Sequence, residues 1–246
     1  MLAASRRTKA RKGVRPRKRA SSRRASAGKS AKSWEKPHVR YLFYAALSIS
    51  VVALLATYYM YAAGMVGLTA ANTYSTIYLE ISFFLVVFSY LLAKGNTLHG
   101  IVSQLGLSKD KARPRFLLIG LLLFAAIFAL EVGAGLFSYY THISLPTNVM
   151  KVLGGMPIYF YIFAFLVVPF TEEILFRGFL VPRIGIIPAA LLFAILHSGY
   201  ASIAEFVAAL VFGLLAGYVF KKTGSLYSSV LAHALVNFLT VAALFL

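Results

Sequence analysis

Long runs of apolar residues dominate the chain after residue 40, and short polar or basic segments separate them. A helix that crosses the hydrocarbon core of a bilayer needs about 20 apolar residues. The runs approach this length, and the fifth is the shortest. The pattern predicts an all-α polytopic transmembrane bundle of about seven spans, with room for an eighth short span within 139–155. The expected spans are 41–63, 75–93, 116–138, 156–181, 184–199, 203–220 and 225–245.

The composition also indicates that lipid surrounds much of this fold. Hydrophobic residues make up 60% of the 246 residues, whereas soluble domains contain roughly 45–50%. The mean hydropathy is +0.78. The chain has no cysteine, which excludes disulfides, thiolate nucleophiles and cysteine-based metal sites.

Basic residues are concentrated at the start of the chain. Residues 1–40 hold 15 of the 25 Lys and Arg and one acid, so their net charge is +14 of the total +18. Such a segment buries too little apolar surface to fold. We therefore expect residues 1–38 to be a disordered cytoplasmic tail that contacts anionic membrane lipids, with no nucleic-acid partner.

The basic loops predict how the helices are oriented. With seven spans, the segments that carry most of the remaining Lys and Arg fall on the side of the tail, as the positive-inside rule requires. We expect an integral protein of a prokaryotic plasma membrane, with the N-terminus in the cytoplasm and the C-terminus outside. The expected division is into N-terminal transmembrane helices at 39–150 and a catalytic core at 151–246.

Ionisable side chains inside apolar spans are costly, so each one is a functional candidate. Three of them are isolated in the sequence and are expected in the outer halves of their spans: Glu80, Glu131 and Glu205. An isolated acid in a membrane usually finds a partner on a neighbouring helix. We therefore interpret these three as structural.

A denser polar cluster lies in the last third of the chain. Glu173 and Arg177 are four residues apart, so they share a helix face and are expected to form an ion pair. Glu172 points about 100° away from this pair. Helical rise predicts a common depth, near the middle of the bilayer, for four residues on three helices: Glu172, His197, His233 and Asn237. The shared depth indicates a water-accessible cavity.

These side-chain types suit hydrolysis. A carboxylate and a histidine can hold and deprotonate a water molecule. A second histidine and an amide can donate hydrogen bonds to the oxyanion that forms when this water attacks a carbonyl group. The chain contains no HExxH motif and no P-loop.

The order and spacing of these residues resemble a known family. EExxxR starts at Glu172, FxxxH joins Phe193 to His197, and HxxxN joins His233 to Asn237. The set resembles the CAAX prenyl-protease and bacteriocin-processing family of intramembrane glutamic endopeptidases, which includes the type II CAAX prenyl endopeptidases. The resemblance covers roughly residues 155–240, including Gly213–Tyr218 and the sequence Thr-Gly-Ser-Leu that begins at 223.

The resemblance implies a role for each motif residue. Glu172 would activate water with His197 as its partner, and His233 and Asn237 would form the oxyanion hole. Glu173 and Arg177 would be supporting residues, with a catalytic contribution from Glu173 left open, and Phe193 would pack beside the cavity. Two histidines and a glutamate could instead bind zinc, but Asn237 is a poor zinc ligand. We therefore expect no cofactor, with a zinc-dependent membrane protease as the alternative.

The expected function is that of an intramembrane endopeptidase. By resemblance, it would hydrolyse a peptide bond near the C-terminus of a membrane-associated peptide or prenylated protein, in a cavity that opens towards the cytoplasm. The alternatives are a non-catalytic scaffold or immunity protein of the same fold, and a transporter or proton relay that uses the isolated glutamates. No feature of the sequence specifies an oligomeric state.

Overall fold

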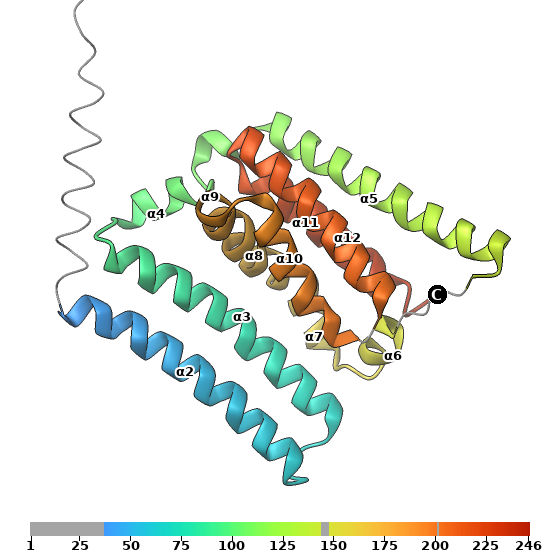
Figure 1. The fold of residues 1–246 in the computed structure, drawn as a ribbon, viewed down its shortest axis with the longest axis horizontal. Helices are drawn as coiled ribbons and strands as arrows, with labels where there is room; N and C mark the ends of the chain where they lie inside the picture. The colour runs from blue at the N-terminus through green and yellow to red at the C-terminus, as the bar shows by residue number, and fades with distance from the viewer. Residues whose placement is uncertain (1–36, 144–147, 201) are drawn as a thin grey trace, which may run out of the picture.

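A computed structural model describes residues 37–143, 148–200 and 202–246, so nearly all of the predicted tail at 1–38 lies outside the described residues. All regular elements in these ranges are helical (Figure 1), which confirms the predicted all-α class. The elements, in chain order, are α2 Pro37–Ala62, α3 Leu68–Ala93, α4 Leu98–Gln104, η1 Lys109–Lys111, α5 Pro114–Thr141, α6 Val149–Leu153, α7 Ile158–Leu166, α8 Val168–Glu173, η2 Ile174–Leu180, α9 Val181–Ile184, α10 Ile186–His197, η3 Ser198–Tyr200, α11 Ile203–Thr223 and α12 Leu226–Ala242.

The membrane-spanning character follows from helix length and hydropathy. Five helical segments of the described residues are long and apolar enough to cross a bilayer, and two shorter apolar helices, Ile186–Tyr200 and Leu226–Ala242, accompany them. These segments coincide with the expected spans, and the protein is an integral membrane protein. Among the described residues of the 139–155 connection, the one helix that follows α5 is α6, whose five residues are too short for an eighth span.

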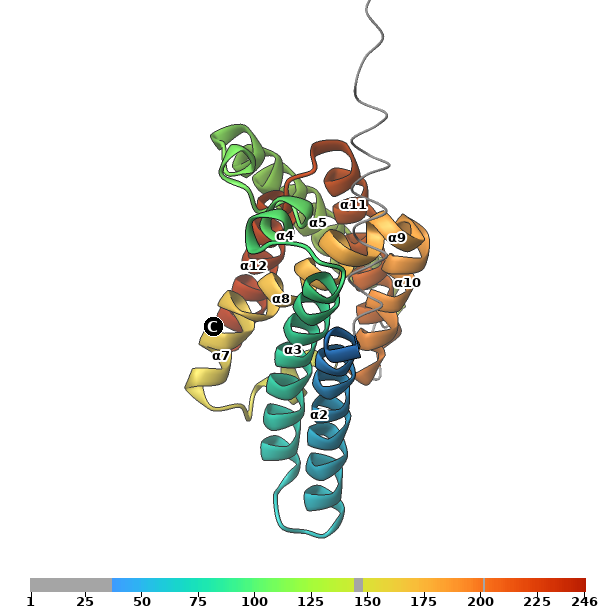
Figure 2. The same cartoon turned by 90° about the vertical axis from the view of Figure 1, so that its left-hand side faces the viewer.

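The helices of the C-terminal half pack between two edges of the molecule. The hairpin of α2 and α3 lies at one edge of the molecule and α5 at the opposite edge (Figure 1). Between these edges, α3 packs against α8 and η2, α10 packs against α11, and α12 contacts α5, α7 and α8. In the view turned by 90°, the turn of the α2–α3 hairpin projects beyond the rest of the bundle (Figure 2).

Small residues allow the closest helix contacts. A Cβ atom added to Gly213 of α11 would lie 2.9 Å from the Cβ of Ala190 in α10, so these helices meet almost backbone to backbone. Gly120 of α5 similarly lies against the backbone of Ser228 in α12. Further along α5, an added Cβ at Gly133 would meet nothing within 4 Å. Helix α5 therefore packs through its first half and separates from the bundle in its second half.

The fourth spanning segment, Ile158–Ile184, is not the continuous α-helix that the sequence predicts. It contains α7, α8 and α9, and a π-helix, η2, lies between α8 and α9. Pro169 and Pro182 each lack an N–H group and cannot extend the regular ladder of hydrogen bonds. Segments of π-helix are rare and are often found at functional sites, and this one begins directly after Glu173.

One end of the bundle gathers the basic segments. Lys111 Nζ donates a hydrogen bond to the carbonyl of Thr223 at 2.9 Å, and Ser225 Oγ donates to the carbonyl of Lys111 at 2.8 Å. The loop between α4 and α5 is thereby joined to the turn between α11 and α12. Gly106 makes this junction possible, because its φ is +76° and an added Cβ would lie 2.6 Å from the carbonyl oxygen of Gly224. We call this end, which is formed by the α4–α5 loop and the α11–α12 turn, the basic end.

Candidate active site

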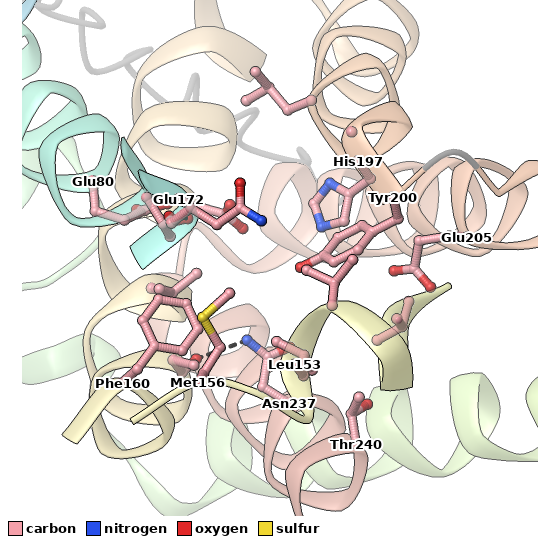
Figure 3. A pocket seen from close by; sticks show the side chains of 18 of the residues that line it. Glu80, Leu153, Met156, Phe160, Glu172, His197, Tyr200, Glu205, Asn237 and Thr240 are labelled. Carbon is pink, nitrogen blue, oxygen red and sulfur yellow. Dashed lines mark hydrogen bonds between the residues drawn. The ribbon is translucent and has the colours of Figure 1, made fainter. Parts of the chain in front are cut away.

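A cavity of about 440 Å³ lies among α3, α6, α7, α10 and α12 (Figure 3). All four residues predicted to be catalytic line it: Glu172, His197, His233 and Asn237. The predicted supporting residues Glu173, Arg177 and Phe193 do not line the cavity and are buried, with exposed fractions of 0%, 1% and 1%. The structure thus brings the polar cluster together, as the expected common depth requires.

The predicted ion pair between Glu173 and Arg177 is confirmed. Arg177 Nη1 lies 2.9 Å from Glu173 Oε1. The guanidinium group also lies 4.3 Å from the ring centroid of Phe193 and 5.0 Å from that of Phe212. Aromatic faces attract a desolvated cation, so one carboxylate and two rings together hold this buried charge.

His233 lies between two carboxyl groups. Its Nδ1 is 3.1 Å from Glu173 Oε1, and its Nε2 is 3.6 Å from Glu172 Oε2. An ionised carboxylate can only accept hydrogen bonds, so Glu173 holds the proton of His233 on Nδ1 and fixes the ring. Glu173 therefore has two contacts, one to the buried arginine and one to a histidine of the cavity.

His197 enters the cavity from the end of α10 (Figure 3). Its Nδ1 lies 3.0 Å from the carbonyl oxygen of Phe193, one turn earlier in the same helix. Because that oxygen can only accept, Nδ1 carries the hydrogen and Nε2 is left as an acceptor. The Phe193 ring lies 4.5 Å from the His197 ring and 5.8 Å from the His233 ring, measured between centroids. Phe193 thus packs against both histidines.

Asn237 is fixed by the helix across the cavity. Its Nδ2 donates a hydrogen bond to the carbonyl of Ala164 in α7 at 2.8 Å, the bond drawn in Figure 3. A primary amide has two N–H donors. One donor therefore holds the side chain in place, and the other is available to a ligand in the cavity.

Glu80 bonds a neighbouring helix, as expected for an acid inside a span, but it is not isolated from the polar cluster. Glu80 lines the cavity, is 2% exposed, and is hydrogen-bonded to Thr171 of α8. Glu131 and Glu205 also line this cavity, so none of the three acids stands apart from it. The depth of Glu80 in its span could have indicated this position, because Glu80 lies 12 residues into α3, about 18 Å along the helix.

The histidines and acids of the cavity were the candidate ligands for zinc. A catalytic zinc ion needs about three protein ligands that converge on one point. Within 37–143, 148–200 and 202–246, no three His, Cys, Asp or Glu side chains are placed to hold a metal ion.

The cavity lies in the half of the bundle away from the basic end. Its lining residues include the first half of α3, parts of α6, α7 and α8, the end of α10, the start of α11, and α12 from His233 onwards. Among the described residues that line it, none is Lys or Arg.

Comparisons with known proteins identify the segment that carries the cluster. Residues 154–239 match the family model described as type II CAAX prenyl endopeptidase Rce1-like. The uncharacterized protein YpbD of Bacillus subtilis (strain 168) is 35% identical over 88 residues, which are 35% of this chain and 47% of that relative. The chain thus spans about half the length of the curated relative that it matches.

No solved structure matches the chain. The matched segment, 154–239, includes all seven residues that the motifs predict for the site. The predicted resemblance is therefore confirmed: this integral membrane protein carries, in residues 154–239, a segment similar to the Rce1-like type II CAAX prenyl endopeptidases.

Proposed function

We propose that the protein is an intramembrane endopeptidase of the CAAX-protease type. The observation that carries the proposal is that one cavity, inside a bundle of apolar helices, gathers Glu172, His197, His233 and Asn237. All four belong to the segment similar to type II CAAX prenyl endopeptidases. A carboxylate, two imidazoles and an amide are sufficient for the addition of water to a carbonyl group.

In the proposed mechanism, Glu172 accepts a proton from a water molecule that His197 Nε2 helps to hold. The water oxygen forms a bond to the carbonyl carbon of the substrate, and the carbonyl oxygen becomes an oxyanion. Asn237, through its second N–H group, and the His233 side chain donate hydrogen bonds to that oxyanion. The C–N bond then breaks, and the proton on Glu172 passes to the leaving amine, so the products are a carboxylic acid and an amine.

The lining of the cavity supports an apolar or lipid-modified peptide as substrate. Beside the polar cluster, the wall includes Leu153, Met156, Phe160 and Val241. Ligand sites of this kind bury most of the ligand against apolar side chains and orient it with a few polar groups. We propose that the substrate is the C-terminal region of a membrane-associated peptide, with a prenylated C-terminus as the specific candidate, and that no metal takes part.

Cleavage in proteoliposomes tests this function. The purified protein is offered two peptides of one CAAX sequence, one prenylated and one not, and the products are identified by mass spectrometry. We expect cleavage of the prenylated peptide, with the rate unchanged by a metal chelator. Equal cleavage of both peptides would contradict the prenyl preference, reversible loss of activity with chelator would contradict the metal-free mechanism, and no cleavage of either would contradict the peptidase.

We further propose that the basic end faces the cytoplasm, with the N-terminus on that side. The positive-inside rule supports this orientation, and the absence of native cysteine makes it testable. Met65 lies in the turn between α2 and α3, and Lys109 lies at the basic end. In intact cells, a membrane-impermeant maleimide should label Met65→Cys and leave Lys109→Cys unlabelled.

Permeabilised cells provide the control for this labelling, because both cysteines should then react. Labelling of Lys109→Cys and not of Met65→Cys in intact cells would reverse the orientation.

A further inference from the structure

Tyr200 is a polar residue of the cavity that the proposed mechanism does not use. It belongs to η3, three residues after His197, and lines the same cavity as the four residues of that mechanism. Its side chain is partly buried, and Figure 3 shows the hydroxyl group pointing into the cavity. Tyr200 belongs to none of the three sequence motifs, so their spacing does not point to it.

Two sets of contacts hold the Tyr200 ring in place. Its centroid lies 6.3 Å from that of the His197 ring, and the two ring planes are inclined at 42°. The ring also packs against the apolar cluster around α6 and α7, which includes Leu153, Met156 and Phe160. This packing joins the end of α10 to α6 and α7, so apolar contacts hold the ring that carries the hydroxyl group.

The hydroxyl group itself is available to a ligand. Among the residues that the structure describes, no backbone or side-chain group forms a hydrogen bond with it. Buried tyrosine hydroxyls normally have a hydrogen-bond partner, and each can donate one hydrogen bond. The wall of the cavity therefore offers a neutral O–H donor beside the polar cluster.

The proposed oxyanion hole requires such a donor whenever His233 is neutral. In that form the one ring hydrogen is on Nδ1, 3.1 Å from Glu173, so Nε2 has no hydrogen to donate. Asn237 donates one of its two N–H groups to the carbonyl of Ala164 and can offer the oxyanion only the other. Oxyanion holes combine several donors, and with neutral His233 the four residues of the mechanism supply one.

We propose that Tyr200 is a catalytic residue whose hydroxyl group donates a hydrogen bond to the oxyanion, together with Asn237. The hydroxyl group carries its hydrogen whether His233 is neutral or charged, and it keeps this hydrogen throughout the reaction. The bond strengthens as negative charge develops on the carbonyl oxygen, so Tyr200 stabilises the transition state more than the bound substrate. The inference rests on the proposed peptidase function and adds a fifth polar residue to its site.

Phenylalanine at position 200 removes the hydroxyl group and keeps the ring. In Tyr200→Phe, kcat for the prenylated peptide in proteoliposomes should fall by about 10²-fold, as when one oxyanion donor is lost, with little change in KM. The matched control is Tyr227→Phe. The Tyr227 hydroxyl donates to the carbonyl of Leu107 at 2.9 Å at the basic end, and Tyr227 does not line the cavity. Its kcat should equal that of the wild type.

A tetrahedral inhibitor separates an oxyanion contact from packing. Once mass spectrometry has located the cleaved bond, a phosphinate group replaces that amide in the same peptide and presents a charged oxygen where the oxyanion would form. Tyr200→Phe should weaken inhibition by this peptide by about the factor that it lowers kcat, as expected for a transition-state analogue. Tyr227→Phe should leave the inhibition unchanged.

Wild-type kcat in Tyr200→Phe would overturn this role and leave the peptidase function standing. A fall in kcat without weaker phosphinate inhibition would also overturn the role, and so would an equal fall in Tyr227→Phe. If the wild type cleaves neither peptide, the peptidase function and the role of Tyr200 fail together.

Discussion

Replacing Glu172 with glutamine is expected to lower kcat for peptide cleavage by about 10²- to 10⁴-fold, the usual contribution of a general base. Glutamine has nearly the same shape and cannot accept a proton from water at neutral pH. The side chain is 7% exposed and lines the cavity, so a substitution of similar size should preserve the fold. Cleavage of the prenylated peptide in proteoliposomes, followed over a range of substrate concentrations, gives kcat and KM separately.

The control for Glu172→Gln is Asp110→Asn, which also neutralises one acid. Asp110 lies at the basic end and does not line the cavity. Asp110→Asn should cleave at the wild-type rate. Equal activity of Glu172→Gln and wild type would remove Glu172 from the mechanism. If a cellular phenotype of gene deletion were fully rescued by the glutamine variant, the scaffold or immunity interpretation would be favoured.

Replacing Arg177 with methionine is expected to lower the free energy of unfolding by about 3–5 kcal/mol, as when one partner of a buried ion pair is removed. The substitution keeps an unbranched apolar side chain against Phe193 and Phe212 but leaves Glu173 buried without its cation. Glu173 also fixes His233, so catalysis should decline in the same variant. Reversible unfolding in mixed micelles, followed by circular dichroism, measures the change in stability.

A double variant tests the cause of this destabilisation. Arg177→Met combined with Glu173→Gln removes both charges and should recover a large part of the lost stability, because no uncompensated charge remains buried. Arg183→Met is the matched control: Arg183 is exposed and stacks over the Phe179 ring at 3.9 Å, a contact that contributes about 0.5–1 kcal/mol. If the double variant were no more stable than Arg177→Met, packing rather than charge would explain the effect.

Much of the architecture follows from local properties of the sequence. Apolar length predicts the spans, because the bilayer imposes one length on every helix that crosses it. Helical spacing predicts the Glu173–Arg177 pair, because residues four apart always share a face. The common depth of Glu172, His197 and His233 follows from the rise of each helix, and the structure places all three at one cavity.

Glu80 could not be assigned in this way, because its hydrogen-bond partner, Thr171, is 91 positions away in the sequence. Packing between helices decides which face of α3 meets α8. The apolar residues of α3 do not indicate which face this is. The interruption of the fourth span by a π-helix was missed for a related reason. A proline shows that the regular ladder must change, but the conformation adopted around it depends on neighbouring helices.

The unequal lengths of the helices have a consequence for the surrounding lipid. At 28 residues, α5 is about 42 Å long, whereas the 12 residues of α10 span only about 18 Å. The hydrocarbon core is about 30 Å thick, so α10, which carries His197 to the cavity, is too short to cross it. The bilayer must thin or water must enter beside α10. We therefore expect the acyl-chain length of the host membrane to influence how readily a peptide segment reaches the cavity.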